Sequence, residues 1–372
     1  MNIKKIIRNI LKVIYIFPIN NNKIFLMNFN GTAIGLDAKA VYQYASENKL
    51  NYKFVWGVTK GFKNRKIENI KFVKLKSLQG IYEMLTSRVL IYNINAPMYI
   101  PFRKCQILIN TWHGLGIKAS GRYVDGFSKE QFNLTTCFLS HAKKYTEVAI
   151  RDSFQYEGEV LCSGVPRNDI FFNINKVKDL KRKVKKIYNI NESDKILLYA
   201  PTFRNDFKYG DIKIDLNKVK DVLEKRKNEK WVIMFRAHPM IKENIKCKNV
   251  IDVSDYEDIQ EILCATDILI TDYSSISWDI SLMYKPVFIF APDINEYINK
   301  RGLNDIYKLF PYSISLNNKE LENQILEFDY EAYKKNLDEY FINIGNYEKG
   351  NSCQILFEYI NNKINKKGGS II

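Results

Sequence analysis

With 372 residues, the chain is too long for one ordinary hydrophobic core and fits two domains of typical size. Its 46% of hydrophobic and 13% of aromatic residues exclude a disordered protein, because there is ample apolar material to bury. The formal net charge of +16 attracts polyanions, which include nucleic acid, anionic membrane surfaces and phosphate-rich substrates or polymers. Charge alone does not choose among these partners.

The first seventeen residues alternate Ile and Leu with Lys and Arg. On a helix, one face collects Ile3, Ile6, Ile7, Ile10, Leu11, Val13, Ile14 and Phe17, and the other collects Lys4, Lys5, Arg8 and Lys12. The segment is too short and too charged to span a bilayer, and it lacks the cleavage site of a signal peptide. We therefore predict an amphipathic membrane-surface helix over residues 1–18. The alternative is that its apolar face packs on the domain.

Residues 19–185 alternate apolar strands with helical segments, which predicts a Rossmann-like domain with a parallel sheet. We expect strands at 23–29, 52–58, 89–93 and 106–111, a glycine-bearing loop at 31–35, and helices at 37–47 and 78–86. Ligands of such sheets bind at the carboxyl ends of the strands. The last of these strands runs directly into a segment with His113 and Gly114, so we expect His113 in that binding region.

Residues 186–372 repeat this rhythm and form the second predicted domain, with strands at 196–200, 231–235, 267–270 and 286–290. The boundary follows the basic run 176–186, which has seven Lys or Arg in eleven positions. Such runs are most often the solvated face of a helix, and we prefer that interpretation to a polymer-binding patch.

Polar side chains follow three strands of the second domain, where the carboxyl ends of a parallel sheet meet at one edge. They are Thr202 and Arg204, Arg236 and His238, and Ser274 and Ser275. The two serines stand between a strand and a helix, where they cap the helix or donate to an anion. Arginines, hydroxyls and a helix N-terminus suit a diphosphate, so the pattern predicts a diphosphate site.

The chain has only three histidines. His113 can act as general base on an attacking hydroxyl, because its ordinary pKa lies near neutrality. His238 can donate to a phosphoryl oxygen or protonate the leaving group. Each alone could equally be a satisfied structural histidine, and we interpret His141 as structural.

Several other site types are not indicated by the sequence. Walker A, Gly-x-Gly-x-x-Gly, His-Glu-x-x-His and Gly-x-Ser-x-Gly patterns are missing from it. The six cysteines have neither Cys-x-x-Cys spacing nor a histidine at zinc spacing, so we predict reduced core cysteines of a cytosolic protein and no metal site.

Five short motifs occur in a characteristic order. They are Thr111-Trp-His-Gly114, Gly164-Val-Pro-Arg-Asn-Asp169, Tyr199-Ala-Pro-Thr-Phe-Arg204, Arg236-Ala-His-Pro239 and Thr271-Asp-Tyr-Ser-Ser275, with Arg301-Gly302 following. With these motifs the chain, from about residue 20 to residue 345, resembles the CDP-glycerol glycerophosphotransferase family of teichoic-acid primases and polymerases. The resemblance implies a GT-B fold, in which two Rossmann-like domains face each other across a cleft.

The resemblance also implies a reaction and roles for residues. A hydroxyl of a lipid-linked or polymeric acceptor would attack the β-phosphate of a CDP-activated polyol and release CMP, at the cytoplasmic face of the cell membrane. Residues 19–185 would form the acceptor side and residues 186–372 the nucleotide-donor side, with the last helices able to pack back on the first domain. His113 would be the base, Arg167 would lie in the cleft, and the diphosphate would be held by Thr202, Arg204, Arg236, His238, Ser274 and Ser275.

One departure from the family pattern leaves the substrate open. The family usually continues its His-Gly with Thr-Pro-Leu-Lys, whereas this chain has Leu115-Gly-Ile-Lys118, so Gly114 and Lys118 are kept and the loop between them differs. Glycerol and ribitol phosphate both remain as donors, and a capsular polymer as well as a wall teichoic acid as product. No cofactor is required by the sequence, although a divalent cation beside the diphosphate is compatible with it.

Two other functions compete with this interpretation. The first is a GT-B glycosyltransferase that uses a nucleotide sugar. The second is a nucleic-acid-binding protein, which the charge favours, but the sequence has no reader motif or aromatic stacking array, so we expect no nucleic-acid partner.

Overall fold

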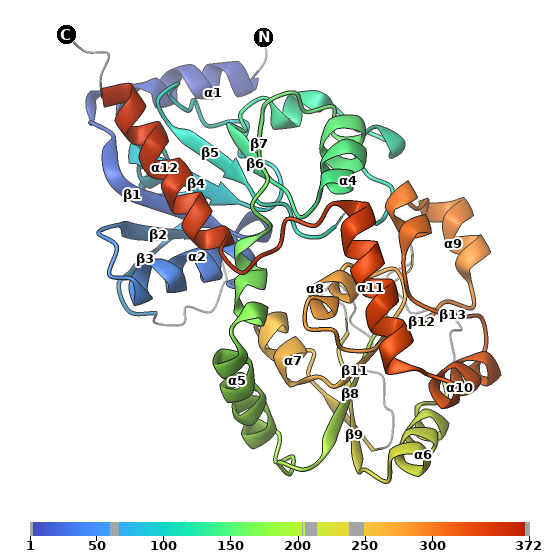
Figure 1. The fold of residues 1–372 in the computed structure, drawn as a ribbon. Coiled ribbons are helices and arrows are strands. Elements are labelled where there is room, and N and C mark those ends of the chain that lie inside the picture. Colours follow the sequence, from blue (N-terminus) through green and yellow to red (C-terminus); the bar gives the residue numbers. More distant parts are fainter. Residues whose placement is uncertain are drawn as a thin grey trace. The chain divides into compact units, whose positions relative to one another are not determined.

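The computed structural model describes residues 3–59, 67–115, 117–202, 204, 214–237 and 249–368. The chain divides into two compact units, each built on its own parallel sheet (Figure 1). Unit 1 comprises Met1–His113, Val124–Asp169 and Tyr347–Ile372, and unit 2 comprises Gly114–Tyr123 and Ile170–Asn346. The predicted pair of parallel α/β domains is therefore confirmed.

Unit 1 holds a seven-stranded sheet in the order β3-β2-β1-β4-β5-β6-β7, with every pair parallel. Its strands are β1 (Asn20–Met27), β2 (Lys53–Val58), β3 (Ile70–Lys74), β4 (Ser87–Tyr92), β5 (Ile107–Asn110), β6 (Cys137–Leu139) and β7 (Glu159–Leu161). Side chains alternate between the two faces of a strand. As a result, Ile24 and Leu26 belong to one buried cluster of the unit, and Phe25 and Met27 to another.

The helices of unit 1 cover both sides of this sheet. They are α1 (Ile3–Leu11), α2 (Leu36–Glu47), α3 (Leu78–Thr86), α4 (Lys143–Tyr145) and α12 (Ser352–Gly368), with a π-helix at Thr146–Ser153 and 3₁₀ turns at Lys12–Ile16, Phe29–Gly31, Lys129–Phe132 and, crossing into unit 2, Pro166–Phe172. The chain returns to unit 1 for α12, whose Leu356, Phe357 and Ile360 complete the cluster around Ile24 and Leu26.

Unit 2 holds a six-stranded parallel sheet in the order β10-β9-β8-β11-β12-β13. Its strands are β8 (Lys195–Ala200), β9 (Trp231–Phe235), β10 (Val250–Asp252), β11 (Ile268–Thr271), β12 (Val287–Phe290) and β13 (Ile314–Ser315). Its helices are α5 (Ile174–Ile187), α6 (Leu216–Lys227), α7 (Ile259–Ala265), α8 (Ile276–Ser281), α9 (Ile294–Arg301), α10 (Asn318–Leu326) and α11 (Tyr330–Ile344), with 3₁₀ turns at Gly121–Tyr123 and Asp305–Leu309.

The division between the units differs from the predicted boundary at residues 185 and 186. Helix α5, which carries the basic run, belongs to unit 2 because its lysines pair there. Lys181 Nζ lies 2.5 Å from Asp267 Oδ1, and Lys183 Nζ lies 2.6 Å from Glu261 Oε2. Buried Lys185 donates to two backbone carbonyls. The run is thus only partly a solvated face, and the chain, which has already contributed Gly114–Tyr123 to unit 2, enters that unit again at Ile170.

The N-terminal segment is helical and packs on unit 1 with part of its apolar surface. Leu11 and Ile14 contact the cluster around Phe25, and Arg103 Nη2 donates to the carbonyls of Ile14 and Phe17 at 3.1 and 2.7 Å. Other apolar side chains of the segment are exposed, namely Ile10 at 65%, Val13 at 65% and Ile16 at 76%. The side chains of residues 1–5, for which we also predicted an apolar and a basic face, are not among those that the structure describes. Within the described chain, none of the helices has the length and apolar character needed to cross a membrane.

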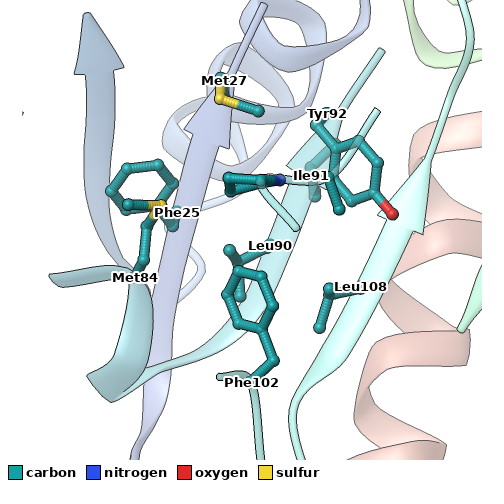
Figure 2. Close-up of a pocket in the computed structure, with 10 residues that line it drawn as sticks. Phe25, Met27, Met84, Leu90, Ile91, Tyr92, Phe102 and Leu108 are labelled. Atoms are coloured by element: carbon teal, nitrogen blue, oxygen red, sulfur yellow. The ribbon is translucent and has the colours of Figure 1, made fainter. Parts of the chain in front are cut away.

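A small cavity of about 10 Å³ lies inside unit 1 (Figure 2). Figure 2 shows Phe25, Met84, Leu90 and Leu108 around it, and its lining is almost wholly apolar. A space of this size and chemistry is a packing defect of the core. It has about the room of one water molecule and cannot hold a substrate.

Candidate active site

The carboxyl ends of three strands of unit 2 meet at one edge of its sheet, as the sequence predicts. The parallel register pairs Thr271 of β11 with Ala200 of β8, and Tyr199 of β8 with Phe235 of β9. The residues after these strands are therefore neighbours, although they lie far apart in the sequence.

Asp272 joins two of these strand ends. Its Oδ1 accepts hydrogen bonds from the backbone N–H groups of Thr202 at 2.9 Å and Tyr273 at 2.7 Å, and its Oδ2 lies 2.9 Å from Nη1 of Arg204. The carboxylate is buried, with 2% of its side chain exposed. Asp272 thus fixes the loop after β8 to the end of β11.

Arg204 is held by carboxylates on two sides. Besides its contact with Asp272, its Nε and Nη2 bind the two carboxylate oxygens of Asp293 at 2.5 and 3.0 Å. Burial opposes the charge of the guanidinium, but these carboxylates raise the pKa of Arg204 above its usual value. The guanidinium also lies over the rings of Tyr273 and Tyr297, 5.2 Å from each centroid. We predicted that the guanidinium of Arg204 binds the diphosphate. Its charge is neutralised by two carboxylates instead, and Arg204 acts as a bridge between loops.

Lys118 reaches the same edge from a short segment of unit 2. Residues 117–119 pair with residues 302–304: Lys118 and Leu303 form an antiparallel bridge, and Ala119 N–H donates to Gly302 O at 3.1 Å. A Cβ on Gly302 would lie 2.8 Å from Ala119 Cβ, so a larger residue would force the pair apart. Burial lowers the pKa of Lys118, and the charge of nearby Asp272 opposes this in part. The resulting pKa is about 8.

Gly114 and the two serines lie together. A Cβ on Gly114 would come 2.5 Å from Oγ of Ser275, so only glycine fits here without a shift of that side chain. Ser275 stands at the N-cap of α8 without a capping bond from its side chain, and Ser274 Oγ accepts only a long contact of 3.5 Å from Ile276 N–H. Capping thus leaves both half-buried hydroxyls with donor capacity.

Arg236 anchors the loop after β10. Its Nη1 donates to the carbonyls of Val253 at 2.9 Å and Tyr256 at 2.7 Å. Burial lowers the pKa of Arg236. Its partner in the predicted site, His238, lies outside the described residues.

His113 is exposed at the end of β5 in unit 1, where the sequence places it. Its Nδ1 lies 2.9 Å from Asn93 O, so in the neutral ring Nδ1 carries the hydrogen and Nε2 the lone pair. The residue before it, Trp112, has a φ of 53°, and its ring lies 4.5 Å from that of Phe154. This left-handed region is uncommon for a residue with a bulky side chain.

Arg167 is paired inside unit 1. Its Nη1 is 2.9 Å from Asp37 Oδ2, both side chains are buried, and its backbone N–H donates to Asp37 Oδ1. We assign it to the core of unit 1 rather than to the predicted cleft. The neighbouring Asn168 donates to Glu348, which also bonds His141, so His141 has the structural contacts expected of it.

Sequence reasoning missed the carboxylates and rings that surround Arg204. Asp272 is the first residue after β11, where the sequence pattern drew attention to the hydroxyls of Ser274 and Ser275, and Asp293 follows β12. No group of three or more His, Cys, Asp or Glu side chains able to hold a metal ion occurs among the described residues. The described cysteines form no disulfide. Cys137, Cys264 and Cys353 are buried as predicted, but Cys105 is half-buried and Cys162 is exposed, so these two are not core cysteines.

Comparisons with known proteins agree with this architecture. The model of the CDP-Glycerol:Poly(glycerophosphate) glycerophosphotransferase family matches residues 10–362. The chain is 28% identical over 377 residues to a teichoic acid poly(glycerol phosphate) polymerase of Bacillus spizizenii, covering 94% of each protein. It is 26% identical over 339 residues to a teichoic acid poly(ribitol-phosphate) polymerase of the same species, covering 86% of this chain and 53% of that protein.

A solved structure shares the fold of the whole chain. It is a variant of the wall teichoic acid polymerase TagF that was soaked with CDPG. The two structures superpose with a TM-score of 0.82 over 98% of this chain and 94% of the other, at 24% sequence identity.

Proposed function

Because this chain belongs to the CDP-glycerol:poly(glycerophosphate) glycerophosphotransferase family, and is a transferase of that kind, we propose the reaction and the roles of its residues. The enzyme moves glycerol phosphate or ribitol phosphate from a CDP-activated donor to a hydroxyl of a lipid-linked or polymeric acceptor. The oxygen of the acceptor forms a bond to the β-phosphorus, the bond between that phosphorus and the bridging oxygen breaks, and CMP leaves with the electron pair.

His113 is the general base of this reaction. The observation that carries the proposal is its exposed imidazole, whose Nδ1 is bonded to Asn93 O, because this leaves the lone pair of the neutral ring on Nε2. Nε2 takes the proton of the acceptor hydroxyl as the new O–P bond forms. At neutral pH an imidazole is partly unprotonated, and this is the form that accepts a proton.

The edge of the unit 2 sheet binds the diphosphate of the donor. Ser274, Ser275 and Thr202 supply hydroxyls, the helix that follows Ser275 turns the positive end of its dipole to them, and Lys118 and Arg236 supply positive charge. His238, by resemblance to the family, donates to a phosphoryl oxygen. Gly114 directly follows His113 in the chain. Because it has no side chain, it leaves room beside Ser275. Arg204 positions these loops without contacting the donor.

The base and the donor groups belong to different units, so they must meet during the reaction. We propose the GT-B arrangement, in which the two units face each other across a cleft. The ends of both parallel sheets that carry functional residues then border this cleft.

A panel of donors tests the reaction. The protein is incubated with CDP-glycerol, CDP-ribitol or common UDP-sugars together with a soluble glycerol phosphate oligomer, and nucleotide release is measured. We expect CMP release from one or both CDP-polyols. Release of UDP without CMP would show a glycosyltransferase instead.

We further propose that the enzyme works at the cytoplasmic face of the membrane, as a peripheral protein. The support is the exposed apolar side of the N-terminal segment, with Ile10, Val13 and Ile16, next to Arg8 and Lys12. Apolar side chains beside basic ones favour anionic interfaces.

Replacing these three side chains with Glu should weaken binding to phosphatidylglycerol vesicles by about tenfold or more, because charge replaces apolar surface in the interface. Co-sedimentation measures the binding, and CMP release with a soluble acceptor should stay unchanged. Ile342→Glu is the matched control, since Ile342 is also highly exposed, at 78%, but lies on α11. Equal sedimentation of the triple variant and the wild type would contradict the proposed docking.

A further inference from the structure

Two asparagines lie side by side next to His113 at the edge of the unit 1 sheet. Met27 of β1 is paired with Tyr92 of β4, and Asn28 and Asn93 are the residues that follow them. Neighbouring strands lie about 4.8 Å apart, so these two residues are adjacent. Asn93 also provides the carbonyl that bonds His113, and the ring of Phe29 lies 5.7 Å from that of His113.

Each asparagine uses one half of its side-chain amide to fix the loop after β1. Asn93 Oδ1 accepts from Phe29 N–H at 2.8 Å, and Asn28 Nδ2 donates to Gly35 O. These backbone partners determine which amide atom is oxygen and which is nitrogen. The remaining atoms, Nδ2 of Asn93 and Oδ1 of Asn28, are buried and have no hydrogen-bond partner in the described part of the chain.

Buried amide atoms of this kind normally have partners, and leaving them without one costs free energy. The loop that covers them is itself strained, since Phe29 and Asn30 have φ values of 44° and 53°. Unsatisfied polar atoms and strain at one place beside a catalytic base indicate a site that a ligand completes.

The two atoms differ in polarity, which identifies the chemical class of the ligand. A hydroxyl both accepts and donates, so it matches an N–H donor next to a carbonyl acceptor. A phosphate offers only acceptors at neutral pH and would be repelled by Asn28 Oδ1, and a metal ion would find a single oxygen ligand here. We propose that Asn28 and Asn93 form a subsite for the hydroxyls of the terminal polyol unit of the acceptor. This inference rests on the proposed function.

The subsite gives the acceptor its orientation. One hydroxyl of the terminal unit is bound by the two amides, which places the neighbouring hydroxyl at Nε2 of His113 for attack. Entry requires displacement of the loop at half-buried Phe29 and exposed Asn30, because both amide atoms are covered.

The test combines a variant protein with a modified acceptor. One soluble oligomer ends in glycerol phosphate, and the other ends in 1,3-propanediol phosphate, which lacks the middle hydroxyl. We expect the wild type to show a KM for the second oligomer that is about tenfold higher, the size of one lost hydrogen bond in a site built for it. Asn93→Asp keeps the bond to Phe29 N–H but removes the donor, and it should raise the KM for the first oligomer and abolish the difference between the two.

The control is Thr32→Ala, which removes a side-chain hydrogen bond within the same loop, to Phe29 O at 2.9 Å, and should keep the tenfold preference. The KM for the donor should not change in any variant. If Asn93→Asp does not fold, the neutral Asn93→Ser takes its place. A wild type that uses both oligomers equally, or a variant that retains the full preference, would overturn the subsite. Absence of CMP release by the wild type with either oligomer would instead refute the proposed reaction.

Discussion

His113→Ala should lower the rate of CMP release by about 10²- to 10⁴-fold, the usual contribution of a general base. Donor binding should change little, because the imidazole lies in unit 1, whereas the proposed diphosphate ligands lie in unit 2. The loss should therefore appear in kcat, and the dissociation constant of CDP-glycerol, measured by titration calorimetry, should stay close to that of the wild type.

A second variant separates basicity from structure. His113→Asn places an amide N–H where Nδ1–H meets Asn93 O, so the turn after β5 keeps its hydrogen bond but has no base. It should be as inactive as His113→Ala and melt at nearly the wild-type temperature. If either variant keeps more than a tenth of the wild-type rate, another group removes the proton.

The sequence predicts the central strands better than the edge strands. The predicted strands all correspond to buried runs, such as 196–200, where every residue after Lys195 is buried in β8. In contrast, the edge strands β3, β7, β10 and β13 were not predicted, and neither was β6, which is buried and lies beside the edge strand β7. These strands have only two to five residues, and periodicity over so few residues is too weak a signal.

The sequence predicted which strand ends come together in unit 2, but not how the side chains there pair. The topology rule places the ends of β8, β9 and β11 together, which the register confirms. It does not say which side chains neutralise one another there. Arg204 and Asp293 are 89 residues apart, and only the folded chain brings them to 2.5 Å. For the same reason Arg167, read from its motif as a cleft residue, turns out to be paired with Asp37, 130 residues away.

Arg204→Met should destabilise unit 2 by about 3–5 kcal/mol, the usual cost of removing one partner from a buried ion pair. The change leaves the carboxylates of Asp272 and Asp293, which are 2% and 19% exposed, without their shared cation. Loss of donor affinity without loss of stability would contradict this prediction and would make Arg204 a ligand of the diphosphate. Urea unfolding and the dissociation constant of CDP-glycerol, measured on the same protein, distinguish the two roles.

Neutralising the carboxylates together with the arginine sharpens this prediction. In the triple variant Arg204→Met, Asp272→Asn and Asp293→Asn, no buried charge is left unpaired, and the Oδ1 of position 272 can still accept from the backbone N–H groups of Thr202 and Tyr273. The main cost of Arg204→Met is that it leaves buried carboxylates uncompensated, and the triple variant removes this cost, so most of the lost stability should return. Because we propose that Arg204 does not contact the donor, the triple variant should also bind CDP-glycerol with nearly the affinity of the wild type. A triple variant that is stable but does not bind CDP-glycerol would show that the guanidinium contacts the diphosphate after all.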